Sequence, residues 1–284
     1  MNSLEKYIKQ NSLQFNRSAL VLGSAPTVKI VSKITFDGIR IGVGDMPVRA
    51  KRLGPYDYWV TANTYYPLPW VANDRRDIEQ SNAITLISSM SVVHSGESKE
   101  NIYSSLEEIS TSQQFVLYNQ KHFDRIDCRD KDFCCQVSQH LVKGLSIQEI
   151  LGEESGLNAP AYGEGSTVAL HGYALAVLLK ANPIYLSGIE LPIQYKDYRA
   201  YKNLFRPNEG ILSKIKRVFK DYIYVSRKRK TDFGAAGQKS ILHDFESISK
   251  IAVSFGIKTF SLSQTSPLNN VSGINFIKLD ELPN

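Results

Sequence analysis

Seven short runs of apolar and β-branched residues recur along the chain, and several of them end in Gly, Ser, Asn or Asp. Runs of this kind, separated by longer helical or polar segments, predict an α/β fold. The first run, residues 18–23 (SALVLG), is apolar almost throughout, as expected for a parallel strand that is covered on both faces. The other predicted strands are residues 38–45, 57–63, 83–88, 115–119, 184–190 and 258–263.

Two segments carry the clearest helical patterns. In residues 166–180 the apolar positions cover most of the helix circumference, which predicts a buried helix packed on a sheet. In residues 240–255 apolar residues recur at spacings of three and four, and Gly256 follows where a helix-terminating glycine belongs. We therefore predict a mostly parallel sheet of about seven strands flanked by helices.

The remaining segments suggest how the domain is organised. A chain of 284 residues is long enough for one large core, so we expect a single α/β domain over residues 1–284. Residues 192–238 are rich in Tyr, Lys and Arg and lack strong periodicity, and we expect them to form a lid-like insertion. Residues 90–160 are predicted to hold a polar insertion followed by a helix.

Composition narrows the class of protein. No run of 18 apolar residues occurs, which argues against a transmembrane helix, and 10% aromatic residues argue against a disordered chain. The net charge is +6, and the run of four basic residues at 227–230 would attract an anion, whether nucleic acid, anionic lipid or a phosphorylated small molecule. The N-terminal segment lacks the apolar stretch of a signal peptide and only three cysteines occur, so we expect a cytoplasmic setting.

Metal and dinucleotide motifs are weak in this sequence. Cys128, Cys134 and Cys135 fit no zinc-finger spacing, and the pair Asp130 and Asp132 lies in an irregular stretch rather than after a strand. The chain contains neither GxGxxG nor a Walker loop, which removes the main support for a dehydrogenase or a P-loop kinase.

Ligands of open parallel sheets bind beyond the carboxyl ends of the strands, so the residues that follow each strand are the candidate site. The turn after the first strand combines small residues with a proline suited to a helix start, so its backbone N–H groups can meet a phosphate; a plain strand-to-helix turn is the alternative. Glycines before the helix at 166–180 suggest a second anion site, and a carboxylate after the sixth strand can accept ribose hydroxyls. The candidate residues are Gly23, Ser24, Ala25, Pro26, Asp45, Asn63, Gly165, Ser166, Thr167, Gly188 and Glu190.

Three segments together resemble a known family. SALVLGSAPTV, GSTVALHGYALAVLLKANPIYLSGIE and GIKTFSLSQTSPLNN resemble, in order and spacing, the bacterial CMP-sialic-acid-dependent sialyltransferases of lipooligosaccharide synthesis. The broader MptE-like, DUF115-type group shares this layout. The resemblance covers about 50 residues and implies a Rossmann-like nucleotide-binding domain with a lid that works without an obligatory metal.

The resemblance also implies roles for individual residues. Tyr195 and Tyr198 would correspond to lid tyrosines that bond the leaving phosphate, and Lys228 and Arg229 would assist them on a closing lid. The general-base histidine of the family has no counterpart at its usual place before the last long helix. His243 is then the candidate base, with Asp232 as the substitute.

The function implied is transfer of a sugar, sialic-acid-like or related, from a CMP-linked or other nucleotide donor to a glycan or lipid-linked acceptor for surface polysaccharide. The expected partners are that donor and acceptor, with peripheral contact to an anionic membrane possible, an oligomer not excluded, and no nucleic acid. An MptE-like diphosphotransferase, which would need Mg²⁺, and a decayed nucleotide- or glycan-binding module are the alternatives.

Overall fold

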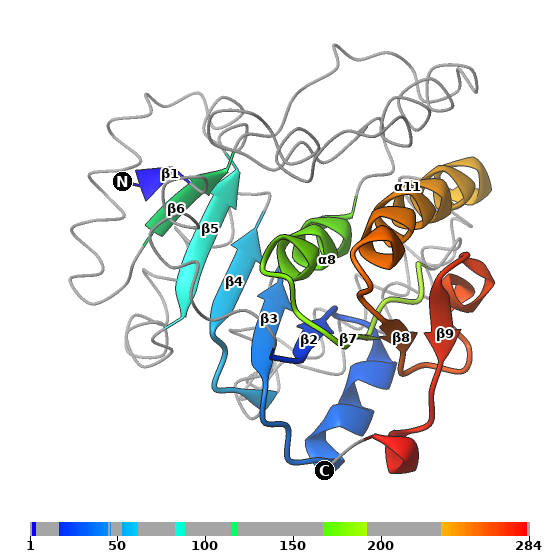
Figure 1. Cartoon of the computed structure of the whole chain (residues 1–284), viewed down its shortest axis with the longest axis horizontal. Coiled ribbons are helices and arrows are strands. Elements are labelled where there is room, and N and C mark those ends of the chain that lie inside the picture. The colour runs from blue at the N-terminus through cyan, green and yellow to red at the C-terminus, as the bar shows by residue number, and fades with distance from the viewer. Residues whose placement is uncertain are drawn as a thin grey trace, which may run out of the picture.

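The computed structural model describes residues 2–3, 17–44, 46, 53–61, 83–88, 115–118, 167–191 and 234–282. Nine strands within these ranges form one sheet in the order β1-β6-β5-β4-β3-β2-β7-β8-β9, and every neighbouring pair is parallel (Figure 1). The parallel α/β fold predicted from the sequence is confirmed.

All seven predicted strands are present, each trimmed by up to three residues at its ends. They are β2 (Ala19–Leu22), β3 (Ile39–Val43), β4 (Tyr58–Thr61), β5 (Ile84–Ser88), β6 (Phe115–Tyr118), β7 (Ile184–Ser187) and β8 (Thr259–Ser261). The sequence analysis missed the two outermost strands, β1 (Asn2–Ser3) and β9 (Ile274–Phe276). Runs of two and three residues carry no readable alternation, so only pairing with β6 and β8 reveals them.

The two long helices cover one face of the sheet (Figure 1). Helix α8 (Val168–Leu178) packs against β2, β3, β4 and β7, and α11 (Gly234–Ser254) packs against α8. As predicted, α8 is buried over nearly its whole surface, and Gly172 faces the sheet where a larger side chain would collide with Val43 and Val21. Helix α11 begins six residues before the predicted start at residue 240 and ends before Gly256, as predicted.

The opposite face is covered by a shorter element. The 3₁₀ helix η1 (Pro26–Lys33) follows β2 and places Val28 and Val31 in a second apolar cluster with Leu20, Leu22 and Trp59. Side chains of alternate strand positions, such as Val21 and Ile41, point instead into the cluster that α8 and α11 complete. The central strands are therefore covered on both faces, which explains the continuous apolar runs of β2 and β7 in the sequence.

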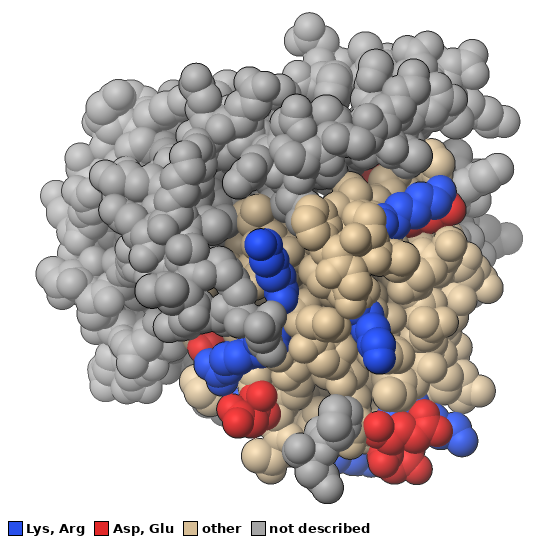
Figure 2. Space-filling view, in the orientation of Figure 1, with Lys and Arg blue, Asp and Glu red and all other residues tan. Residues whose placement is uncertain are grey.

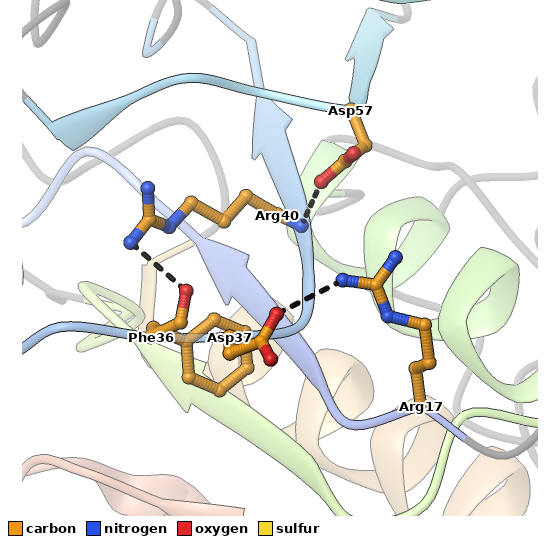
Figure 3. Close-up of polar contacts among 5 residues, drawn as sticks. All are labelled: Arg17, Phe36, Asp37, Arg40 and Asp57. Carbon is orange, nitrogen blue, oxygen red and sulfur yellow. Dashed lines mark hydrogen bonds and ion pairs between the residues drawn. The ribbon is translucent and has the colours of Figure 1, made fainter. Parts of the chain in front are cut away.

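Polar contacts tie together the amino ends of the strands (Figure 3). Arg17 pairs with Asp37 at 3.3 Å, and the Arg40 N–H donates to the Asp57 carboxylate at 2.7 Å. The Arg40 guanidinium donates to the carbonyls of Gly54 and Phe36. These contacts connect the loops at the amino edge of the sheet. The turns that contain Gly23 and Gly188 lie at the other, carboxyl edge.

Candidate functional site

The chain reverses its direction of travel across the sheet between β2 and β7. From β2 it proceeds outward through β3 to β6, and from β7 it proceeds the other way through β8 to β9. Helix η1 lies on one face and α11 on the other, as right-handed crossovers in opposite directions require. The carboxyl ends of β2 and β7 therefore define the topological switch point, where open α/β sheets bind their ligands.

Two glycines bring the strand ends together at this point. A Cβ atom on Gly23 would collide with the carbonyl oxygen of Gly188, and one on Gly188 would collide with the carbonyl oxygen of Gly23. Gly188 also has φ of +72°, in the left-handed region that favours glycine. Both positions were predicted from the sequence, and each requires glycine here for a steric reason.

The sequence analysis expected the N–H groups of the turn after β2 to meet a phosphate, but two of them bond to backbone carbonyls instead. Gly23 donates to the carbonyl of Ser187 at 2.8 Å, and Ala25 donates to that of Gly188 at 3.0 Å. Pro26 has no N–H and stands at the start of η1, as predicted. Among the described residues, the N–H groups of Ser24 and Thr27 have no acceptor, so two donors of this turn remain for an anion rather than the whole turn.

Glu190 lies next to this turn on the η1 side of the sheet. Its side chain is buried, and the Thr27 hydroxyl donates to Oε1. Burial raises the pKa of the Glu190 carboxyl, and the hydroxyls of Thr27 and Ser263 act in the opposite direction. Oε2 is buried without a hydrogen-bond partner in the described part of the chain. The sequence analysis placed this carboxylate after the sixth strand as an acceptor of ribose hydroxyls. The structure shows that it is enclosed, and a hydroxyl donor would satisfy Oε2.

Thr167 lies on the other face of the same edge. It caps α8, and its side chain accepts weakly from the Ala169 N–H at 3.4 Å. The start of α8 contacts the turn after β3, since a Cβ on Gly44 would lie 3.4 Å from Val168 Cγ1. Thr167 and Glu190 therefore lie at the carboxyl edge of the sheet on opposite faces. Thr167 lies on the α8 face near the end of β3, and Glu190 lies on the η1 face after the end of β7.

The candidate base His243 lies in the amino-terminal half of α11. The helix ends just before β8 begins, so this half lies toward the carboxyl edge of the sheet. The His243 side chain is 40% exposed, and its Nδ1 lies 3.9 Å from Glu246 Oε2.

The structure adds a titratable group that sequence reasoning passed over. Asp244 is 2% exposed, and burial holds the pKa of its carboxyl well above the ordinary value of 3.8. It lies on the helix face that carries Ile241, Phe245 and Ile248, so the apolar periodicity of α11 contained the signal. A charged residue in the middle of an apolar stripe is the feature that could have been noticed.

The other predicted site residues lie outside the described residues. These are Asp45, Asn63, Gly165, Ser166, Tyr195, Tyr198, Lys228, Arg229 and Asp232. The same holds for the three cysteines and for Asp130 and Asp132. Their proposed roles therefore stay predictions.

One face of the described part of the chain carries dispersed charge. On the face shown in Figure 2, lysine and arginine side chains form separate spots, several of them beside acidic side chains. The described ranges contain no group of three or more His, Cys, Asp or Glu side chains placed to hold a metal ion. They also contain no helix that is both long and apolar enough to cross a membrane.

The chain is similar to solved protein structures, but its sequence matches neither a protein-family model nor a curated protein. The solved structures that it resembles include the sialyltransferase CstII from Campylobacter jejuni in complex with cytidine 5′-monophosphate, at 15% identity and a TM-score of 0.46, with 92% of this chain and 86% of that chain covered. Another is the α-2,3-sialyltransferase from Campylobacter jejuni in apo form, at 12% identity and a TM-score of 0.44, with 95% and 83% covered. Likeness at this level does not by itself assign an activity to the chain.

Proposed function

We propose that this protein is a glycosyltransferase that moves a sugar from a nucleotide donor, CMP-linked, to a glycan or lipid-linked acceptor. The observation that carries the proposal is the switch point, where β2 and β7 end in closely packed glycines and leave the N–H groups of Ser24 and Thr27 available. The family resemblance of these same segments, stated above, supplies the donor class. Sites of this geometry hold the phosphate of a nucleotide against a helix start.

In such a reaction the acceptor hydroxyl attacks the anomeric carbon as the nucleotide phosphate leaves. Negative charge grows on the phosphate oxygen, and the N–H donors of Ser24 and Thr27 would stabilise it. Glu190 would accept a hydroxyl of the nucleotide ribose at Oε2, because Thr27 already holds Oε1 in place. His243 would take the proton of the acceptor, with Asp232 as the substitute, and Tyr195, Tyr198, Lys228 and Arg229 would act from the lid.

Nucleotide binding tests the first half of the proposal. CMP at about 100 times its Kd should raise the melting temperature by about 5 °C or more, and purine nucleotides should raise it less. Glu190→Gln should weaken CMP binding about tenfold, because a charged acceptor for the ribose is lost. Glu246→Gln, which changes a carboxylate on the surface of α11, is the matched control and should leave CMP binding unchanged.

Turnover tests the second half. His243→Ala should lower transfer at least a hundredfold while CMP still binds, since general-base catalysis contributes about 10²–10⁴ in rate. If His243→Ala keeps full turnover and Asp232→Asn loses it, the base is Asp232. Activity that depends strictly on Mg²⁺ would favour the diphosphotransferase alternative, and CMP binding without hydrolysis or transfer would favour a binding module.

A further inference from the structure

A pocket lies at the amino edge of the sheet, at the opposite end of β7 from the switch point. Its volume is about 340 Å³, and it opens on the η1 face where β7 and β8 begin. The lining residues are Asn182, Pro183, Tyr185, Lys258, Phe260 and Ile277. None of them belongs to the site proposed above for the nucleotide, so the pocket needs an explanation of its own.

Aromatic rings form one wall of this pocket. Tyr185 and Phe260 are register partners on β7 and β8, and their rings stack with 5.8 Å between centroids and an interplanar angle of 23°. Phe36 packs against Tyr185 nearly at a right angle, at 6.0 Å, which supports the wall. Phe260 is only partly buried, and Pro183 and Ile277 add further apolar surface. A flat aromatic ring stacks well on a surface of this kind.

The rim of the pocket is fixed by hydrogen bonds between two loops. Asn182 Oδ1 accepts from the Lys258 N–H at 3.0 Å, and Asn182 Nδ2 donates to the Gly256 carbonyl at 3.3 Å. The Ile184 N–H donates to the Lys258 carbonyl at 2.8 Å. The backbone of Lys258 is therefore bonded on both sides, and a ligand would pay little to order this rim.

Lys258 supplies one positive charge at this rim. Its side chain is exposed, and among the described residues it forms no ion pair. No acidic residue lines the pocket. One lysine beside apolar walls matches a molecule with an apolar body and a single negative charge, which is a carboxylate rather than a phosphate dianion.

We propose that this pocket, the amino-edge pocket, binds a small aromatic carboxylate. The ring of the ligand stacks on the wall formed by Phe260 and Tyr185, and its carboxylate pairs with the Lys258 ammonium. A volume of about 340 Å³ accommodates a single substituted ring. The site does not depend on the proposed function, because the two sites lie at opposite edges of the sheet.

The test is titration of the full chain with three probes, followed by ligand-observed NMR. Phenylacetate carries both the ring and the charge, phenylacetamide lacks the charge, and cyclohexylacetate lacks the aromatic ring. We expect phenylacetate to bind about tenfold more tightly than phenylacetamide, since a charged hydrogen bond is lost in the amide. It should bind about threefold more tightly than cyclohexylacetate, since ring stacking is lost.

Variants locate the binding. Lys258→Gln should weaken phenylacetate about tenfold and leave phenylacetamide unchanged. Lys180→Gln, at an exposed lysine two residues before Asn182, is the matched control and should change neither. Phe260→Leu keeps an apolar side chain but removes the ring, so it should abolish the preference for phenylacetate over cyclohexylacetate.

Saturating CMP should not displace phenylacetate, because the nucleotide site lies at the other edge. The proposal is overturned if phenylacetate does not bind, if the amide or the saturated ring binds as tightly, if Lys258→Gln and Lys180→Gln behave alike, or if CMP competes. Binding of CMP can fail while binding of phenylacetate survives, and the reverse also holds, so this proposal and the proposed function fail separately.

Discussion

Among the described residues, each face of the sheet buries one carboxyl group, and the two groups have different surroundings. Asp244 is on the buried face of α11 among apolar residues, and no described residue forms a hydrogen bond with its side chain. Glu190 lies under η1, where Thr27 donates to it and Ser263 stands nearby. Both carboxyls have raised pKa values, but only Glu190 has polar neighbours on two elements that also line a groove.

The difference assigns separate tasks to the two faces. The face with α8 and α11 is built from aromatic and aliphatic packing, with Tyr173 stacked on Phe245 at 5.8 Å between ring centroids. The η1 face combines its apolar cluster with hydroxyls, lysines and the enclosed Glu190. We infer that the packing of the α8 face mainly stabilises the fold, whereas the polar groups enclosed on the η1 face are available for a binding role.

The largest effect should come from breaking the apolar face. Phe245→Ala should lower the free energy of unfolding by about 3–5 kcal/mol, because it opens a cavity beneath Tyr173. Phe255→Ala, at a side chain 54% exposed on the same segment, should change it by less than about 0.5 kcal/mol. Urea unfolding of both variants measures the difference, and equal losses would contradict the packing described for α11.

An intermediate effect should come from the glycine contact at the switch point. Gly188 and Gly256 both have φ of +72°, but a Cβ on Gly188 meets the backbone of Gly23 whereas one on Gly256 meets nothing within 4 Å. Gly256→Ala should therefore cost about 1–2 kcal/mol for its backbone conformation alone. Gly188→Ala should cost about 2 kcal/mol more than that, since backbone must shift. Similar losses for the two variants would mean that the strand ends are not in contact.

The smallest expected effect is a difference between Asp244 and Glu190 in how each makes stability depend on pH. The pKa of Asp244 is raised above its ordinary value of 3.8, so the folded state binds more protons than the unfolded state above about pH 4. Stability contributed at this site therefore falls as pH rises from about 4 to the folded-state pKa.

Asp244→Asn should remove this slope and raise stability at neutral pH by about 1–2 kcal/mol. Glu190→Gln should give a smaller gain, because the hydroxyls of Thr27 and Ser263 already offset part of the burial effect. Thermal melts from pH 4 to pH 8 compare the two variants. If Glu190→Gln increased stability more than Asp244→Asn, the conclusion that Asp244 is the less well compensated buried acid would be wrong.

The sequence predicted the inner architecture well because its signals are local. Residues 19–22 and 184–187 are apolar runs. Helix α8 is apolar around most of its circumference, and α11 carries an apolar period and is followed by Gly256. The short outer strands β1 and β9 were missed because their pairing depends on neighbours far away in the chain. The start of α11 was placed late because residues 234–239 carry no apolar stripe.

Prediction of the site was more uneven. Gly23, Ser24, Ala25, Pro26, Gly188 and Glu190 were chosen because each follows a strand, and the structure gathers them at one point. Thr167 was chosen as part of a second anion site at the helix start, and it borders the carboxyl edge from the opposite face. The role of Thr27 as a donor to Glu190 joins residues 163 positions apart, and nothing in the sequence pairs them.

By itself, the sequence determined the seven inner strands, the two long helices and the burial of the central strands on both faces, because apolar patterns follow directly from residue order. Only the tertiary structure decided that Glu190 is enclosed, that Asp244 has no hydrogen-bond partner among the residues the structure describes, and that η1 and the loop after β8 line a pocket. Burial and hydrogen bonding depend on which residues far apart in the sequence come into contact, and the order of the strands in the sheet decides those contacts.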